Sequence, residues 1–393
     1  MKNYTVEIHA LEVLPPNNLN RGETNEPKTL ELGGVIRNYV SSQCWKKAMR
    51  DYYYAHNVTD QNKGIRTRDI STIVNTLVEK HGYSKEDATR IVNTGAIWKI
   101  VGFSLKDNDK SDEEKTKDDE DVCILASVFA FHNTDFEKFA DVLAQYDVHC
   151  EPKRGGKYDV IYPKANKKSS KEEKDYANAF KKSLASVFDK VPTDVALFGR
   201  MLAGSEALTV AGATQVAPAW SVSEATVDSD YYIAMDEMTG VTGAGMIGTK
   251  EFASGILYRY GCVSSNILEK TLDGNTEAVE TLIGKFIEAF TKSVPTGSQT
   301  GYASNVLPYY TYVTITESTP QNFGEAFEEA VPKDVAHKNY VQEVFEDFAV
   351  EAYETTTDKP VKAFVVGKNS KLDAEQVHLS KLGDAVCMYL HSN

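Results

Sequence analysis

Residues 19–50 read LNRGETNEPKTLELGGVIRNYVSSQCWKKAMR, and this stretch is more informative than any other part of the chain. A polar loop with a glycine pair leads to Ser41-Ser42-Gln43, and a segment rich in cations follows. From Arg21 to Arg50 there are six basic residues against three acidic ones, a local charge of 6 − 3 = +3. Hydroxyls and amides at a helix start, with Lys and Arg one turn further on, suit a phosphate backbone. The stretch is therefore compatible with phosphate binding, and a solvated helix face is the alternative.

The charge of the whole chain points the other way. The 393 residues carry a formal net charge of −14, which by itself argues against a nucleic-acid partner. The distribution is uneven, however: residues 106–121 hold nine acids and four lysines, whereas residues 151–182 hold ten basic residues and five acids. Phosphate binding depends on local rather than total charge. An acidic protein with a basic groove is therefore the expectation.

The composition excludes several classes of protein. No stretch resembles a transmembrane segment or a signal peptide, so we expect no membrane partner. The five cysteines are scattered without a CxxC pair, which favours reduced thiols and a cytoplasmic protein. The eight histidines have no metal-ligand spacing, and no GxSxG, HExxH or Walker A string is present. We expect no catalytic residue, no metal and no cofactor.

Hydrophobic periodicity and capping signals predict alternating strands and helices. A half-buried strand is expected at 4–13, a helix at 43–55 with Ser42 as its N-cap, and a long β-hairpin at 221–250 that continues as a strand to 264. The other predicted helices are 66–81, 85–93 (capped by Ser84), 134–146 (with a Thr134/Glu137 capping box), 172–189, 276–293, 323–331 and 333–354. The other predicted strands are 97–105 and 122–132, which flank the acidic segment 106–121, and 193–202, 306–316 and 360–366; residues 154–174 are predicted as a loop. This order is compatible with an α+β sheet of the ferredoxin-like type and does not select it over other α+β folds.

The stretch 19–50 resembles the CasC family, the repeated backbone subunit of the type I-E CRISPR complex called Cascade. The family carries an LNRD-type loop, a Lys, a GG pair and an SSQ-x-x-K-R-A-x-R helix. Further matching segments follow in the family's order: 196–201 (ALFGRM), 227–230 (VDSD), 248–255 (GTKEFASG) and 258–260 (YRY). The resemblance covers most of residues 1–317.

The resemblance implies an α+β fold shaped like a hand, with an RRM-like (ferredoxin-like) palm, a helical finger insertion and a β-hairpin thumb. On this chain the palm would comprise 1–55, 193–202 and 251–393, the fingers 56–192 and the thumb 203–250. The acidic segment 106–121 would be an addition within the fingers.

The resemblance also implies the residues that bind the guide RNA. Lys28, Lys46 and Arg50 correspond to the family's backbone contacts, at the helix start marked by Ser42 and Gln43. The spacing agrees independently, because residues four apart share one helix face; the alternative is a solvated helix face. Arg21 is a further candidate, which can instead brace its own loop.

Three apolar residues correspond to the positions at which the family contacts bases. Met201 would pack against bases, or it is an ordinary core residue of a strand. Tyr232 and Ile247 would lie on the thumb and act as wedges, or tyrosines 231 and 232 simply pack the hairpin. In the family, the thumb of one subunit presses on the guide beside its neighbour.

A lysine cluster at 167, 168, 171 and 174 corresponds as a group to finger lysines that hold target DNA. The alternative is a solvated Lys/Glu helix. The cluster's members are Lys167, Lys168, Lys171 and Lys174.

The leading hypothesis is a non-catalytic guide-RNA carrier whose partners are the CRISPR RNA, target DNA, copies of itself and other Cascade subunits. Two alternatives stay open. One is a metal-dependent endoribonuclease like the backbone subunits of type III complexes, since acidic residues lie near the RNA loop. The other is a stand-alone α+β RNA-binding protein.

Overall fold

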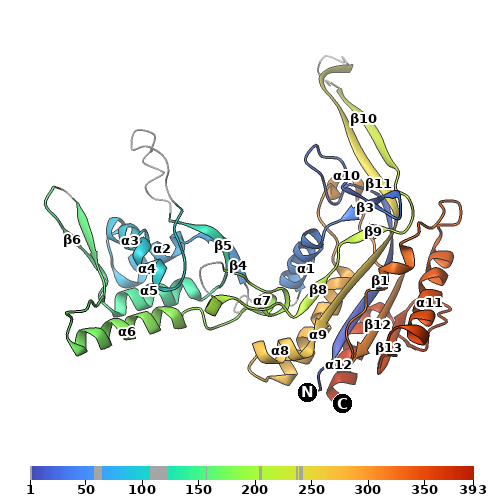
Figure 1. Ribbon diagram of the computed structural model, residues 1–393. Helices are drawn as coiled ribbons and strands as arrows, with labels where there is room; N and C mark the ends of the chain where they lie inside the picture. Colours follow the sequence, from blue (N-terminus) through green and yellow to red (C-terminus); the bar gives the residue numbers. More distant parts are fainter. Residues whose placement is uncertain are drawn as a thin grey trace. The chain divides into compact units, whose positions relative to one another are not determined.

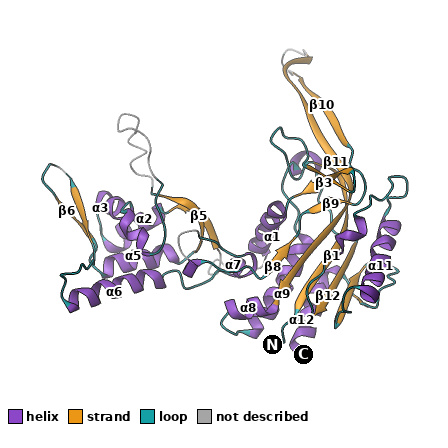
Figure 2. Cartoon of the chain, in the orientation of Figure 1, coloured by secondary structure: helices purple, strands orange, loops and turns teal. Residues whose placement is uncertain are grey.

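The computed structural model describes residues 2–56, 64–106, 123–155, 157–202, 206–235, 238 and 242–393. The chain forms two compact units: residues 1–57 with 213–393, and residues 58–212 (Figures 1 and 2). It is a mixed α+β fold with one large sheet. In the described part of the chain, no helix is both long enough and apolar enough to span a membrane.

The first unit is built on a ten-stranded sheet with the order β14-β13-β12-β1-β11-β9-β3-β2, in which β8 and β10 also pair with β11. β1 (Thr5–Asn17) is central, because it pairs antiparallel with both β11 (Thr242–Ser264) and β12 (Tyr310–Thr316). The predicted strand at 4–13 is confirmed, but it is buried on both faces rather than half-buried. The other strands are β2 (Thr29–Leu32), β3 (Val35–Val40), β8 (Thr214–Val216), β9 (Ala219–Ser221), β10 (Val227–Met235), β13 (Lys362–Val366) and β14 (Glu375–Gln376).

Helices cover both faces of this sheet. On one face lie α1 (Ser42–His56) and α9 (Thr276–Lys292), since Trp45 and Phe290 both contact the Arg259 guanidinium. On the other face α11 (Lys338–Thr355) places Phe345 against Tyr258, the strand neighbour of Arg259. The remaining helical segments are α8 (Ser265–Thr271), α10 (Gln299–Tyr302), η3 (Phe323–Phe327), η4 (Leu379–Lys381) and α12 (Leu382–Ser392).

A long hairpin of β10 and β11 extends from the sheet (Figure 1). Its register pairs Tyr232 with Gly248 and Ile233 with Ile247. The predicted hairpin and its continuation to residue 264 are confirmed, and β11 is one continuous strand of 23 residues.

The second unit has an aromatic core of its own that includes Trp98, Phe103, Phe129, Phe139 and Phe188. Trp98 and Phe139 stack with their ring centroids 4.4 Å apart. The elements of this unit are β4 (Gly64–Asp69), α2 (Ser71–His81), α3 (Lys85–Val92), α4 (Gly95–Ile100), β5 (Ile124–His132), α5 (Asp135–Gln145), β6 (His149–Pro152), β7 (Tyr158–Ile161), α6 (Lys171–Ser186), α7 (Thr193–Phe198) and η2 (Glu206–Leu208).

Several predicted elements of the second unit are wrong. The start of the predicted helix 66–81 is strand β4, which pairs with β5. The predicted strand 97–105 is mostly helix α4, and only Leu105 bridges to Leu125. The predicted strand 193–202 begins as helix α7. Short apolar runs fit either structure by periodicity alone, so tertiary packing decides. Residues 107–121 of the acidic segment lie outside the described residues.

Capping chemistry was predicted with mixed success. Ser84 accepts the Asp87 N–H and caps α3 as expected. Thr134 makes no side-chain cap; its hydroxyl is hydrogen-bonded to His132 Nδ1 at 2.8 Å. The loop predicted at 154–174 contains β7, which pairs with β6. In the first unit, the predicted helices 323–331 and 333–354 become η3 and the shorter α11, and α12 was not predicted.

Candidate nucleic-acid interface

The start of α1 is an exposed helix N-terminus with a pre-arranged cap. Ser41, rather than the predicted Ser42, caps the helix: its Oγ accepts the Cys44 N–H at 3.3 Å. The Ser41 N–H in turn donates to Asn20 Oδ1 at 2.8 Å. Within the described residues, the N–H groups of Ser42 and Gln43 have no protein acceptor. Two free N–H groups at the positive end of a 15-residue helix favour an anion.

The loop of residues 19–28 is fixed against this helix start. Its two ends meet where the Lys28 N–H donates to the Asn20 carbonyl at 2.9 Å, and Arg21 bridges to Pro27. Asn18 Nδ2 donates to the carbonyls of Asn25 (2.7 Å) and Glu251 (3.1 Å). The loop is therefore tied to both α1 and the root of the hairpin, and the exposed Arg21 side chain is left at its surface.

Lys28, Lys46 and Arg50 supply positive charge near this helix start. Burial and the adjacent Arg50 lower the pKa of Lys46, so these two cations lie close together. Burial raises the pKa of the Cys44 thiol, and the charges of Lys28 and Lys47 oppose that shift, so both cations lie near the first turn of α1. Lys47, by contrast, is paired with Asp51 on the exposed side of the helix. The fold thus gathers the predicted RNA residues Lys28, Ser42, Gln43, Lys46 and Arg50.

Arg37 does not contribute to the basic surface, although it was counted in the local charge of +3. It is fully buried, and its guanidinium donates to the carbonyls of Ser221 and Val222, both at 2.9 Å. It also donates to the Glu328 carbonyl at 3.0 Å. Its role is to join β3 to the segments around it.

Asn20 is a positioning residue that the motif analysis did not single out. We expect Asn20→Ala to weaken RNA binding about fivefold, because the hydrogen bond that joins the loop to the helix N-cap is lost, and such a bond contributes about 1 kcal/mol. Asn20→Asp keeps an acceptor for the Ser41 N–H but adds a negative charge beside the anion site. It should therefore bind RNA more weakly than Asn20→Ala while unfolding at a higher temperature. Equal affinities of both variants and the wild type would contradict this role.

Met201 is presented to solvent by an unusual turn in the second unit. Helix α7 ends at Gly199, whose φ of 79° favours glycine, and a Cβ there would lie 2.9 Å from the Gly212 nitrogen. Arg200 turns inward, donates to the Ala130 carbonyl at 3.0 Å and stacks on Phe129. Met201 itself is 82% exposed. The alternative that it is a core residue of a strand is therefore wrong.

The hairpin exposes apolar side chains on both faces. Directly paired residues share a face of an antiparallel ladder, so Tyr231, Ile233 and Ile247 lie on one face and Tyr232 on the other. The first three are 63%, 48% and 61% exposed. Tyr232 packs over Gly248, where a Cβ would lie 2.6 Å from Tyr232 Cζ. The two residues expected to act as wedges, Tyr232 and Ile247, therefore lie on opposite faces of the hairpin.

The lysine cluster lies at the start of α6. Ser170 and Glu173 form a capping box there, and all four lysines, Lys167, Lys168, Lys171 and Lys174, are exposed. None forms an ion pair with a residue that the structure describes. Cations at a helix N-terminus oppose the helix dipole, so an incoming anion would relieve a local repulsion.

The sheet face on the α11 side is rich in aromatic rings, but most of it is not available to bases. His9, Tyr258, Tyr312 and Phe323 are buried with Phe345, and the rings of His9 and Phe323 stack at 4.8 Å. The buried Glu7 accepts the Tyr260 hydroxyl at 2.8 Å, and burial raises the pKa of Glu7 to about 7. The aromatic rings of this face therefore belong to the core and do not form an open surface on which bases could stack.

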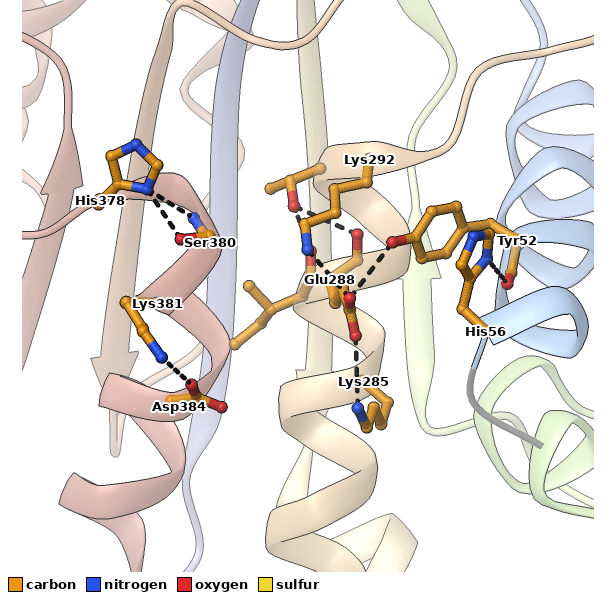
Figure 3. Close-up of polar contacts among 11 residues, drawn as sticks. Tyr52, His56, Lys285, Glu288, Lys292, His378, Ser380, Lys381 and Asp384 are labelled. Carbon is orange, nitrogen blue, oxygen red and sulfur yellow. Dashed lines mark hydrogen bonds and ion pairs between the residues drawn. The ribbon is translucent and has the colours of Figure 1, made fainter. Parts of the chain in front are cut away.

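A second group of lysines is neutralised within the unit. The Glu288 carboxylate accepts from Lys292 at 3.0 Å and from the Tyr52 hydroxyl at 3.2 Å, and Lys285 lies at 3.4 Å (Figure 3). Burial disfavours the charged Glu288, but the hydrogen bond from Lys292 is among the contacts that bring its pKa below the usual value. This cluster connects α1 with α9 and holds the site's helix in place.

The fold and the site thus define an α+β protein in which a helix with a cationic N-terminal end lies against the large sheet. The CT1975-like protein family matches residues 6–387, and the chain belongs to this family. This confirms the resemblance to CasC. None of the curated proteins compared with the chain matches it.

Two solved structures have a similar fold. A chain of a "CRISPR RNA-guided surveillance complex, pre-nicking" is 23% identical with a TM-score of 0.75, and the match covers 99% of each chain. A chain of a "CRISPR RNA-guided surveillance complex" is 22% identical with a TM-score of 0.65, over 99% of this chain and 100% of the other.

Proposed function

We propose that the chain is a non-catalytic, CRISPR RNA-binding backbone subunit of a type I-E Cascade surveillance complex. Several copies assemble along one guide RNA in the cytoplasm, together with other Cascade subunits, and present the guide to target DNA. The observation that carries this proposal is the α1 start, where free N–H groups meet Lys28, Lys46 and Arg50. Family membership and the likeness in fold to two chains of CRISPR RNA-guided surveillance complexes support it.

In this proposal, the first unit is the RRM-like palm. Four of its strands, β12-β1-β11-β9, follow the spatial order 4-1-3-2 of a ferredoxin-like sheet, if β1, β9, β11 and β12 count as strands one to four. The two crossover helices α1 and α9 lie on one face, as that fold requires. The β10–β11 hairpin is the thumb, and the second unit is the fingers. The α6 lysines of the fingers contact the backbone of the target DNA and do not read its sequence.

Co-expression with a repeat-spacer RNA, followed by native mass measurement of the purified complex, tests this proposal. Several copies of the chain on one RNA are expected. A single copy per RNA would point to a stand-alone RNA-binding protein. Cleavage of a complementary RNA on addition of divalent metal would overturn the non-catalytic assignment.

The hairpin offers a prediction with its own matched control. Replacing Tyr231 and Ile247 with serine removes apolar surface from one face, and we expect fewer copies per guide RNA. Burial of each such side chain on assembly stabilises by roughly 1.5–3 kcal/mol. Replacing Tyr232 and Met246 with serine changes the opposite face and should affect assembly less. Both double variants should unfold near the wild-type temperature, because these side chains are exposed in the free chain. Equal assembly defects would contradict the assignment of the wedge to the face that carries Tyr231 and Ile247.

A further inference from the structure

The hairpin of β10 and β11 joins the sheet beside an irregular part of β1. Regular pairing of β1 with β11 ends at Leu14 and Gly255, and the register shifts before Asn17 pairs with Ala253. The two intervening residues of β1 are both prolines. Proline has no N–H group and cannot donate to a strand ladder. The outer part of β11 therefore needs other donors along this edge.

Two side-chain amides supply donors at this edge. Asn17 Nδ2 donates to the Ala253 carbonyl at 2.8 Å, and Asn18 Nδ2 donates to the Glu251 carbonyl at 3.1 Å. Carbonyls two residues apart on a strand point to the same edge, so the two amides act side by side. Both asparagines are buried. They therefore hold the root of the hairpin, which begins where Val227 pairs with Ala253.

Asn18 differs from Asn17 because its second hydrogen bond reaches into the loop of residues 19–28. Asn18 Nδ2 also donates to the Asn25 carbonyl at 2.7 Å. Asn25 has a φ of 72°, in the left-handed region that asparagine tolerates better than most residues. The other hydrogen bonds of Asn17 go to backbone groups within two residues of it. Of this pair, Asn18 is thus the one that bonds both to the hairpin and to the interior of the loop.

The same loop is bonded to the helix start that carries the proposed RNA contacts. The Ser41 N–H donates to Asn20 Oδ1, and the Asn20 carbonyl accepts the Lys28 N–H, which closes the loop. An anion at Lys28 and the start of α1 therefore favours the closed loop. A closed loop in turn holds the Asn25 carbonyl in place for Asn18. Hydrogen bonds through one loop thus connect the start of α1 with the root of the hairpin.

We propose that Asn18 is a positioning residue that couples RNA binding at the loop to the order of the hairpin. The inference rests on the proposed function and adds regulation to it, because a copy that has bound the guide offers its neighbour a more firmly held hairpin than a free copy does. The element with two states is the loop, closed or open at Asn25. Such coupling is reciprocal, so a hairpin held in place also strengthens RNA binding at the loop.

Hydrogen exchange of the full chain, with and without an RNA fragment that holds a single copy, measures this coupling. In the wild type, the fragment should slow exchange of the hairpin amides at 227–233 and 247–253 about fivefold or more. Asn18→Leu keeps the shape of the side chain and removes its N–H donors. In this variant RNA should still slow exchange in the loop but not in the hairpin. Equal protection of the hairpin in both proteins would mean that RNA contacts the hairpin directly, and it would overturn the proposal.

Asn17→Leu is the matched control. It removes an equivalent hydrogen bond to β11 and leaves the bond between Asn18 and Asn25 intact. Its hairpin should exchange faster than that of the wild type without RNA, and it should still respond when RNA binds. Loss of the response in both variants would mean that a weakened hairpin root is the cause, and the coupling through Asn18 would be wrong.

The wild type alone separates this inference from the proposed function. If it binds the fragment and its hairpin does not respond, the coupling is overturned and the proposed function stands. If it does not bind the fragment, the proposed function is overturned, and the coupling with it.

Discussion

Arg259→Met is expected to lower the free energy of unfolding by about 3–5 kcal/mol, because it leaves a buried carboxylate without its partner. Arg259 is 2% exposed and Glu12 is fully buried, and their side chains lie 2.6 Å apart. Burial raises the pKa of Glu12, and the charge of Arg259 acts against that shift. The guanidinium also stacks over Trp45 at 3.5 Å and donates to the Phe290 carbonyl at 2.6 Å. The change therefore also loosens α1 and α9.

The matched control for this prediction is the double variant Glu12→Met with Arg259→Met. It removes both charges and leaves side chains of similar bulk, so most of the lost stability should return. Chemical denaturation of the full chain measures both variants. A double variant as unstable as Arg259→Met alone would mean that the packing of the guanidinium, rather than the ion pair, is what stabilises the sheet.

Lys46→Ala combined with Arg50→Ala is expected to weaken guide RNA binding about ten- to a hundredfold at physiological salt. Removing two phosphate contacts should also reduce the slope of log affinity against log salt by about 1.4, since each contact contributes about 0.7 for a single strand. Stability should change little, because neither side chain belongs to the apolar core. Filter binding or fluorescence anisotropy over a salt series measures the effect.

Lys47→Ala serves as the control on the same helix. Lys47 is paired with Asp51 and lies on another side of α1, so its removal should leave the salt slope nearly unchanged. An unaltered affinity in a folded Lys46/Arg50 double variant would remove α1 from the RNA interface.

The sequence predicted correctly those elements that have a long hydrophobic periodicity or a capping residue at one end. The amphipathic helix at 276–293 and the hairpin at 221–250 are confirmed, and Ser84 caps its helix as expected. The run at 193–202 was predicted as a strand and begins as helix α7, because six residues of Thr, Asp, Val, Ala, Leu and Phe fit both periodicities. The burial of β1 on both faces was not predicted either, since it depends on α11 from the far end of the chain.

The candidate site was predicted by motif rather than by geometry. The stretch 19–50 identified Lys28, Lys46 and Arg50, yet the same count of charges included the buried Arg37. Nothing local distinguishes an arginine that donates to buried carbonyls from one that faces solvent. Likewise, the face on which Tyr232 lies depends on register, and a shift of one residue exchanges the two faces of a hairpin. The strand pairing of Tyr39 with Trp220 joins residues some 180 positions apart and has no local sequence signal.

The continuity of β11 gives the hairpin a mechanical property. The strand runs without interruption from Thr242 to Ser264, roughly 75 Å at 3.3 Å per residue. Its inner half is bonded to β1 from Gly255 to Ser264, so a load on the hairpin is carried by a row of parallel hydrogen bonds at the centre of the sheet. The hydrogen bonds of such a row must break together rather than one at a time. The hairpin is therefore a stiff lever with a fixed reach, and a row of identical levers would mark equal lengths along whatever they grip.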